Sequence, residues 1–274
     1  MKNIKAKIIA NELVGGRYYR LRLASPYLGG KTRPGQFFEI KCSEVPGTTL
    51  LRRPLGAHRI FKGGVEMLYE AVGKGTEALS RRMAGESLGV IGPLGNGFDV
   101  KKKAIIIAGG IGVAPLVALA ETVIKKGGEA EVLIGARTGS HILCEKELKK
   151  FGCNVRISTD DGSKGKKGFV TELLEASLSS RRNKNNVIGA TIYSCGPIPM
   201  LKAVAQLAAI HSISCQVSLE ERMACGVGVC LGCPVKVKAP QPIVDTQYPI
   251  RNTQYEYKMV CKDGPVFDAK DVIW

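Results

Sequence analysis

The hydrophobic pattern of this 274-residue chain changes near Asp99, and the change limits the folds open to it. Before Asp99, short segments that alternate apolar and polar residues recur between glycines and prolines, as in 18–25 (YYRLRLAS). Such segments are typical of antiparallel strands in a barrel or sandwich. After Asp99, continuous apolar runs such as 104–110 (AIIIAGG) alternate with helical segments. This alternation predicts a parallel sheet with helices on both faces.

The second pattern ends near Cys215, and a tail of about 60 residues follows. We therefore predict a multi-domain β and α/β chain with three units. These are an antiparallel β-barrel over 1–98, a parallel-sheet nucleotide-binding domain over 99–214 and a small cysteine-bearing domain over 215–274.

The tail carries three cysteines on a glycine-rich segment, 218–233 (SLEERMACGVGVCLGC). Cys225, Cys230 and Cys233 have the spacing C-x4-C-x2-C, and Cys261 follows after 27 further residues. Plant-type [2Fe–2S] ferredoxins use this spacing for the thiolates that hold two irons. The glycines let backbone N–H groups turn toward the sulfurs. We therefore predict a [2Fe–2S] cluster on these four cysteines.

A zinc site is the alternative for the same cysteines, although zinc sites usually combine two close pairs and only Cys230 and Cys233 form one. A zinc-binding interaction module thus stays open as a function of a different class. Its natural partner would be nucleic acid, because the formal net charge is +16. The basic groups are short, dispersed and free of interleaved aromatic residues, however, so we expect no nucleic-acid binding.

Glycines also follow two predicted parallel strands, in 105–116 (IIIAGGIGVAPL) and 193–200 (YSCGPIPM). Ligands of open α/β sheets bind at the carboxyl edge of the strands, and a helix N-terminus favours phosphate. Tight strand-to-helix turns would need the same glycines. The residues expected to contact a nucleotide are Gly109, Gly110, Gly112, Cys195, Gly196 and Pro197.

No apolar run is long enough to predict a membrane span, and the N-terminus lacks the features of a secretory signal. We therefore expect a cytoplasmic protein whose cysteines stay reduced. The histidines, His58, His141 and His211, are isolated in the sequence and are predicted to be structural or surface residues. We assign no catalytic residue and expect no hydrolysis.

The strand-rich first unit, the GGIGVAP and CGP segments and the ferredoxin-type cysteines together resemble the ferredoxin–NADP⁺ reductase superfamily. Within it, 218–233 and 260–267 (VCKDGPVF) resemble the electron-transfer subunits of dihydroorotate dehydrogenase B. The resemblance implies FAD on the first unit, NAD(H) on the second and a [2Fe–2S] cluster on the third. It also implies a hetero-oligomer with a separate, FMN-containing catalytic subunit, in which dihydroorotate becomes orotate for pyrimidine biosynthesis.

The resemblance further assigns flavin contacts on the first unit. The family's R-P-x-S type motif falls on RRPLG, and its next contacts fall on LYE and VGKGT. The residues at those positions are Arg53, Pro54, Leu55, Gly56, Leu68, Tyr69, Glu70, Gly75 and Thr76. Two departures stand out. Gly56 occupies the place of a hydroxyl residue near the reactive edge of the flavin, and the gap before Cys261 suggests an insertion across 239–257.

Several choices stay open at this point. Arg137 and Ser140 would suit the 2′-phosphate of NADPH or would only end a strand, and the resemblance favours NADH. Asp160 and Asp161 would reach a ribose or form a solvated turn. A reductase subunit of the same superfamily that serves ferredoxin, sulfur or a hydrogenase is the nearest alternative function.

Overall fold

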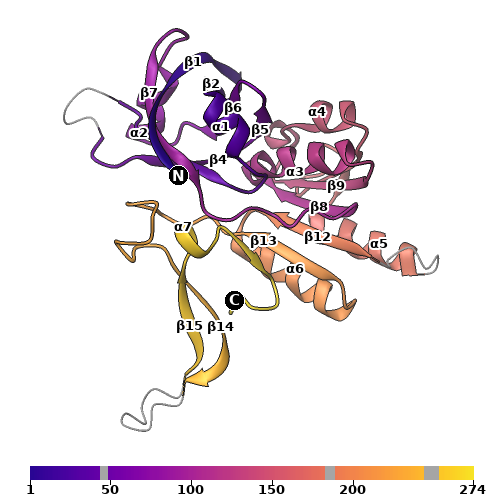
Figure 1. The fold of residues 1–274 in the computed structure, drawn as a ribbon. Coiled ribbons are helices and arrows are strands. Elements are labelled where there is room, and N and C mark those ends of the chain that lie inside the picture. The colour runs from indigo at the N-terminus through magenta and orange to yellow at the C-terminus, as the bar shows by residue number, and fades with distance from the viewer. Residues whose placement is uncertain (44–48, 183–188, 244–252) are drawn as a thin grey trace.

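The computed structural model describes residues 1–43, 49–182, 189–243 and 253–274 (Figure 1). Within these ranges, the strands form two seven-stranded sheets and one two-stranded sheet. The predicted combination of an antiparallel sheet, a parallel sheet with helices and a small C-terminal region is confirmed. Much of the predicted insertion, 244–252, lies outside the described residues.

The first sheet is antiparallel and has the order β4-β3-β7-β1-β2-β6-β5. Its alternating pattern buries one side chain in two, so that Leu21 and Leu23 enter the core while Arg22 stays outside. The elements are β1 (Lys2–Gly15), β2 (Tyr18–Ala24), α1 (Pro26–Lys31), β3 (Phe37–Ile40), β4 (Arg53–Gly56), β5 (Arg59–Phe61), β6 (Gly64–Glu70), α2 (Lys74–Ser80) and β7 (Ser87–Leu94).

The second sheet has the order β11-β10-β9-β8-β12-β13-β16, and its strands are parallel except for β16. Alternate residues of β8 enter different cores. Ile105 and Ile107 pack with α5 and α6, whereas Ile106 packs with α3. The elements are β8 (Lys103–Gly109), η1 (Gly110–Val113), α3 (Ala114–Lys125), β9 (Glu129–Ala136), η2 (Gly139–His141), α4 (Glu145–Lys150), β10 (Asn154–Thr159), β11 (Lys166–Lys167), α5 (Val170–Arg182), β12 (Ala190–Cys195), α6 (Ile198–Ile210), β13 (Ser214–Ser218) and β16 (Val266–Asp268).

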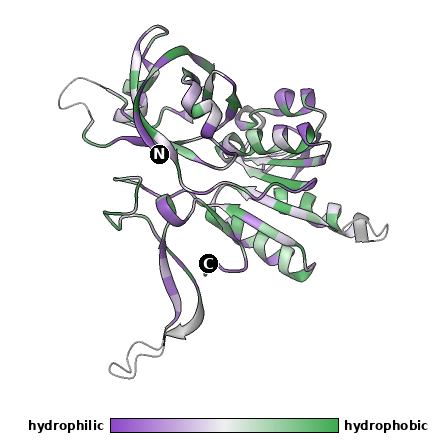
Figure 2. Cartoon of the chain, in the orientation of Figure 1, coloured by the Kyte–Doolittle hydropathy of each residue, from purple (hydrophilic) through white to green (hydrophobic). Residues whose placement is uncertain are grey.

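This two-sided burial explains why the β8 segment reads as a continuous apolar run, and the strands of this sheet are largely hydrophobic in Figure 2. Strand order also defines a switch point, because β9 lies on one side of β8 and β12 on the other. The two glycine-bearing strand ends therefore become neighbours at one edge of the sheet.

The C-terminal region is a long hairpin of β14 (Pro234–Ile243) and β15 (Thr253–Met259), followed by the short helix α7 (Val260–Asp263). It is attached to both larger units. Strand β16 pairs with β13, which spans the predicted boundary at residue 214. Asn96, just after β7, accepts a hydrogen bond from the Val266 N–H and donates to the carbonyl oxygens of Asp263 and Val266.

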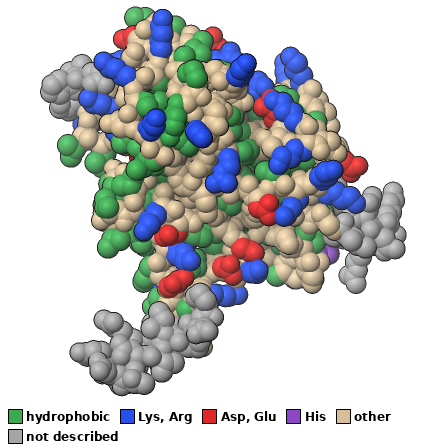
Figure 3. Space-filling model, in the orientation of Figure 1, with side chains coloured by type: hydrophobic (Ala, Val, Ile, Leu, Met, Phe, Trp, Pro, Cys, Tyr) green, Lys and Arg blue, Asp and Glu red, His purple; other side chains and the backbone are tan. Residues whose placement is uncertain are grey.

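The described helices include none that is both long and apolar enough to cross a membrane. Lys and Arg side chains are spread over the face shown in Figure 3, between acidic and apolar ones.

Candidate functional site

The long gap between Cys233 and Cys261 is spanned by the β14–β15 hairpin. Its register pairs Pro234 with Met259, so the residues just outside the pair meet again. The Val260 N–H donates to the Cys233 carbonyl oxygen at 2.9 Å, and the Cys261 N–H points at the Cys233 sulfur at 3.4 Å. Both side chains are buried. The hairpin thus brings these two cysteines together from distant parts of the chain.

The other two cysteines form a second pair on the glycine-rich loop. Three residues of this loop have left-handed backbone, Gly226 at φ +68°, Gly228 at +83° and Leu231 at +55°. The turns direct N–H groups at sulfur, and the Val227 N–H lies 3.4 Å from the Cys225 sulfur. Burial raises the pKa of Cys225, but the Val227 and Cys230 N–H groups, the Cys230 thiol and the Val229 N–H outweigh it and lower that pKa to about 6. The loop is therefore built to stabilise thiolate sulfur.

The cysteines fit a two-iron cluster better than a single zinc ion. Cys225 contacts Cys230, and Cys261 contacts Cys233, whose proximity together with burial raises the pKa of Cys261 to about 12. A tetrahedral zinc site would need all four sulfurs about 3.8 Å apart. Among the described residues, the group of three ligand atoms within 4.8 Å of one another lies elsewhere, at His58, Cys144 and Glu147. Two adjoining pairs of thiolates suit two bridged irons, and the charge of Cys225 also acts on Cys261 across the two pairs.

A buried carboxyl group from the barrel touches the glycine-rich segment 218–233, which is called the cluster loop below. No sequence pattern indicated this contact. Glu39 on β3 is 1% exposed, and a Cβ on Gly226 would lie 2.5 Å from its Cγ atom. Among the residues that the structure describes, neither carboxyl oxygen of Glu39 has a hydrogen-bond partner. Burial raises the pKa of Glu39 to about 7, although the charge of Arg52 lowers it. The contact fixes the cluster loop against the barrel and explains why residue 226 is glycine.

The structure brings together two of the predicted flavin residues, Arg53 and Gly75. Arg53 opens the edge strand β4, and Gly75 lies in the first turn of α2. A Cβ on Gly75 would lie 2.7 Å from the Arg53 Nε atom, so glycine leaves room for the guanidinium. The Thr76 hydroxyl accepts the Val72 N–H at 3.0 Å and shapes the same turn. A guanidinium beside the start of a helix suits a pyrophosphate.

The remaining predicted flavin residues lie in β4 and β6, and one of them, Gly56, contacts the second unit. Pro54 and Leu55 are half-buried in β4. Leu68 and Tyr69 are buried, and the Tyr69 hydroxyl donates to Asn11 at 3.0 Å, so neither side chain is free to contact a ligand. Glu70 ends β6 and pairs with Arg17 at 2.7 Å. A Cβ on Gly56 would lie 3.3 Å from the Pro115 Cβ atom, so β4 directly contacts the start of α3.

A cavity of about 620 Å³ lies at the carboxyl edge of the second sheet, where the strand order switches. Four predicted contact residues line it, namely Gly109, Gly110, Pro197 and Glu70. Arg137 and Asp160 line it as well, whereas the Ser140 hydroxyl contacts Thr138 at 2.7 Å. Sequence reasoning missed other lining residues that come from separate segments, which are Arg17, Tyr18, Gly135, Ala136, His141, Phe169, Val170, Thr171, Pro199, Met200 and Ala203.

The other predicted nucleotide residues pack behind this cavity. A Cβ on Gly112 would lie 2.5 Å from the Cys195 carbonyl oxygen, and one on Gly196 would lie 2.9 Å from the Gly109 nitrogen. Cys195 itself is fully buried, and burial raises the pKa of its thiol. Gly112, Cys195 and Gly196 therefore hold the two strand ends together and shape the cavity.

Known proteins are similar to this chain over its whole length. Residues 220–273 match the family model of the iron–sulfur cluster binding domain of dihydroorotate dehydrogenase B, and 106–206 match the oxidoreductase NAD-binding domain. The chain is 37% identical to "Dihydroorotate dehydrogenase B (NAD(+)), electron transfer subunit" of Desulforamulus reducens, covering 100% of this chain and 99% of that protein. The protein of the same name from Caldanaerobacter subterraneus subsp. tengcongensis is 34% identical, with 99% and 98% covered.

Solved structures share the fold. A chain of the NADH-dependent reduced ferredoxin–NADP oxidoreductase superposes with a TM-score of 0.79 at 26% identity, covering 98% of this chain and 90% of that one. The ferredoxin reductase of carbazole 1,9a-dioxygenase gives a TM-score of 0.62 at 20% identity, with 77% and 66% covered.

Proposed function

Because this chain belongs to the family of electron-transfer subunits of NAD-dependent dihydroorotate dehydrogenase B, we propose that it links NAD(H), FAD and a [2Fe–2S] cluster in one path. At the end of that path is an FMN-containing catalytic subunit, with which this chain forms a hetero-oligomer. The observation that carries the proposal is the return of the distant Cys261 to Cys233, close enough for the charge of Cys225 to act on it, with the glycine-rich loop packed against the barrel.

Each unit supplies groups suited to one cofactor. Arg53 and the turn at Gly75 would hold the pyrophosphate of FAD, and the glycine turns lining the cavity would hold NADH. Bound at Arg53 and Gly75, FAD would supply the conversion between two-electron hydride transfer and one-electron transfer. Asp160 and Arg137 both line the cavity, and the preference for NADH rests on the relatives, which are named as NAD(+) enzymes.

The cluster loop offers an exit for electrons. Cys230 is exposed, and its neighbours Val229 and Leu231 are 76% and 67% exposed. Exposed apolar side chains around a redox centre suit a protein interface, since burying them on a partner is favourable. We place the catalytic subunit against this loop. None of the nine cysteines is in a disulfide, which suits the reducing cytoplasm that we propose for this chain.

The docking part of the proposal is tested with Leu231→Asp in the reconstituted complex. We expect at least tenfold slower NAD⁺ reduction by dihydroorotate, because a carboxylate would be buried at the interface. Reduction of an artificial acceptor by NADH should keep its rate. Ile210→Asp is the matched control, since Ile210 is 75% exposed on α6. Equal effects of the two substitutions would argue against docking at the cluster loop.

The division of labour between subunits is tested on the isolated chain. It should reduce artificial acceptors with NADH and should not oxidise dihydroorotate. Oxidation of dihydroorotate by the purified chain would refute the proposal. Co-purification with a ferredoxin or a hydrogenase, in place of a dihydroorotate dehydrogenase catalytic chain, would favour the alternative reductase function.

A further inference from the structure

A fully buried histidine joins the first two units at the place where their proposed cofactors must meet. His58 lies between β4 and β5, and its backbone N–H donates to the Glu66 carbonyl oxygen at 2.8 Å. Its ring Nδ1 atom lies 2.9 Å from the carbonyl oxygen of Ala114. Since a carbonyl only accepts, Nδ1 carries the hydrogen and donates it. One side of the ring is thereby bound to the first residue of α3.

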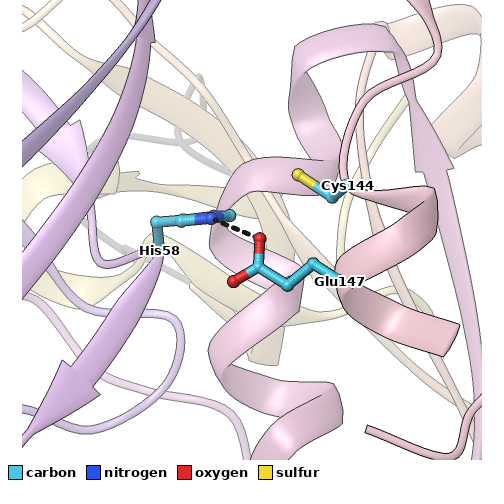
Figure 4. Close-up of side chains that lie close together, drawn as sticks. All are labelled: His58, Cys144 and Glu147. Atoms are coloured by element: carbon cyan, nitrogen blue, oxygen red, sulfur yellow. Dashed lines mark ion pairs between the residues drawn. The ribbon is translucent and has the colours of Figure 1, made fainter. Parts of the chain in front are cut away.

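The other side of the ring faces α4, as Figure 4 shows. The His58 Nε2 atom lies 3.4 Å from a carboxylate oxygen of Glu147. That carboxylate is held in turn by Arg20 of β2 at 3.1 Å and by Arg59 of β5 at 3.5 Å. The imidazole therefore has a fixed orientation, with contacts to the barrel, to α3 and to α4.

Two adjacent contacts set the spacing between the units. Gly56 packs on Pro115, and His58, two residues later, binds Ala114. Gly56 ends β4, the strand proposed to hold the flavin. Ala114 follows directly on η1, which begins at the cavity-lining Gly110. Any shift of the Ala114 carbonyl relative to β4 therefore moves the nucleotide turn relative to the flavin strand.

We propose that His58 is a positioning residue, whose hydrogen bond to Ala114 sets the distance between NADH and FAD for hydride transfer. The proposal rests on the proposed function, because it requires both cofactors to bind where they are placed above. Hydride transfer depends steeply on geometry, and a displacement of about 1 Å can cost roughly a hundredfold in rate. Binding of either cofactor alone depends much less on this spacing.

The same cluster contains the ligand types of zinc, because Cys144 lies within 4.8 Å of the ring nitrogen and the carboxylate. The Glu147 carboxylate is already paired with two cations, Arg20 at 3.1 Å and Arg59 at 3.5 Å, and the Glu66 carboxylate also lies 3.8 Å from the His58 Nε2 atom. A metal ion on Glu147 would have to displace both guanidinium groups. The arrangement thus favours a structural hydrogen bond over metal binding.

The test compares His58→Ala, His58→Asn and His58→Gln in the FAD-loaded full chain. Asparagine keeps a donor near Nδ1, whereas glutamine keeps a polar group near Nε2 and lacks the Ala114 contact. We expect flavin reduction at saturating NADH, followed by anaerobic stopped-flow absorbance, to slow ten- to a hundredfold in His58→Ala and His58→Gln. In His58→Asn the rate should recover to within about threefold of wild type. FAD content and the Kd for NAD⁺ should change less than threefold in every variant.

A core variant separates this effect from a general loss of stability. Leu174→Ala empties a buried site on α5, on the opposite face of the second sheet, and should lower the Tm without slowing flavin reduction. Equal rates in His58→Asn and His58→Ala would overturn the proposal, as would an unchanged rate in His58→Ala. One zinc ion bound per wild-type chain and absent from all three His58 variants would instead show that His58 belongs to a metal site. If wild-type chain binds no FAD, the proposed function fails first, and that outcome is visible before any variant is compared.

Discussion

At the residue scale, the sequence identifies residues whose chemistry lies in a local pattern and misses those that function through a distant neighbour. The cysteine spacing within one loop was enough to select Cys225, Cys230 and Cys233. Glu39 and His58 carry no such pattern, because Gly226 and Ala114, which give them their roles, are far away in the chain. Cys195 is the converse case. It stands beside a nucleotide turn in sequence, yet its side chain points into the core.

Gly75→Ala is expected to weaken FAD binding about tenfold. The added Cβ would meet the Arg53 guanidinium at 2.7 Å and displace it, and a charge-assisted hydrogen bond is worth roughly 1.5–3 kcal/mol. Alanine would otherwise favour a helix, so the loss would come from the collision alone. The Kd is measured by titrating apoprotein with FAD and following flavin fluorescence.

Gly73→Ala is the control for Gly75→Ala, because its Cβ would meet no atom within 4 Å and its φ of −171° suits any residue. Its Kd for FAD should stay within about twofold of wild type. If Gly75→Ala also stays there, Arg53 does not hold the flavin in the way we propose.

Cys261→Ser is expected to abolish the [2Fe–2S] cluster and leave FAD bound. Serine cannot supply the thiolate that completes the second pair of ligands beside Cys233. Iron and sulfide per chain, together with the visible spectrum, measure the loss. Cys215→Ser changes another buried cysteine, on β13, and should keep a full complement of iron. Normal iron content in Cys261→Ser would remove this residue from the ligand set.

At the scale of elements, the hydrophobic pattern predicted most strands and helices because burial of their side chains is periodic. The continuous apolar run 104–110 was predicted as part of the parallel sheet, and β8 covers most of it. What the sequence could not predict depends on pairing between remote segments. Strand β16 joins the second sheet through β13, and the β14–β15 register decides where Cys261 lies. Neither strand pairing can be predicted from local composition or from the spacing of residues.

The contact between α4 and the barrel should make stability depend on pH. Burial raises the pKa of Glu147, but His58, Arg20 and Arg59 outweigh it, so the pKa lies below its usual value. The pKa of Glu147 is therefore lower in the folded chain than in the unfolded chain. At a pH between these two values the unfolded chain binds more protons, so the contact stabilises the fold fully only above the pKa of the unfolded chain. This stabilisation is lost as the pH falls through the pKa of the folded chain. At pH 7, Glu147→Gln should cost on the order of 2 kcal/mol of unfolding free energy.

Urea unfolding of wild type and Glu147→Gln from pH 7 down to pH 3 measures this effect. The difference between the two should shrink toward zero at the acid end. Glu175→Gln on α5 changes an exposed carboxyl and should stay within about 0.5 kcal/mol of wild type throughout. A difference for Glu147→Gln that is constant with pH would show that its charge does not stabilise the contact.

At the scale of the whole molecule, three units meet so that each proposed cofactor site borders the next. The β4–α3 contact joins the strand proposed to hold the flavin to the turn proposed to hold the nucleotide, and Glu39 joins the barrel to the loop of Cys225. The chain resembles its relatives over its full length, which agrees with a path that needs all three units. The sequence predicted the units, whereas the contacts that align them became visible only in the folded chain.

Anaerobic titration of the purified chain with NADH, followed by absorbance and electron paramagnetic resonance, tests the central claim most directly. We predict that NADH bleaches the flavin bands and produces the signal of a reduced [2Fe–2S] cluster, and that Cys261→Ser shows the bleaching without the signal. A chain that contains zinc in place of iron, or whose flavin is reduced by NADH while no cluster signal develops, would contradict the account.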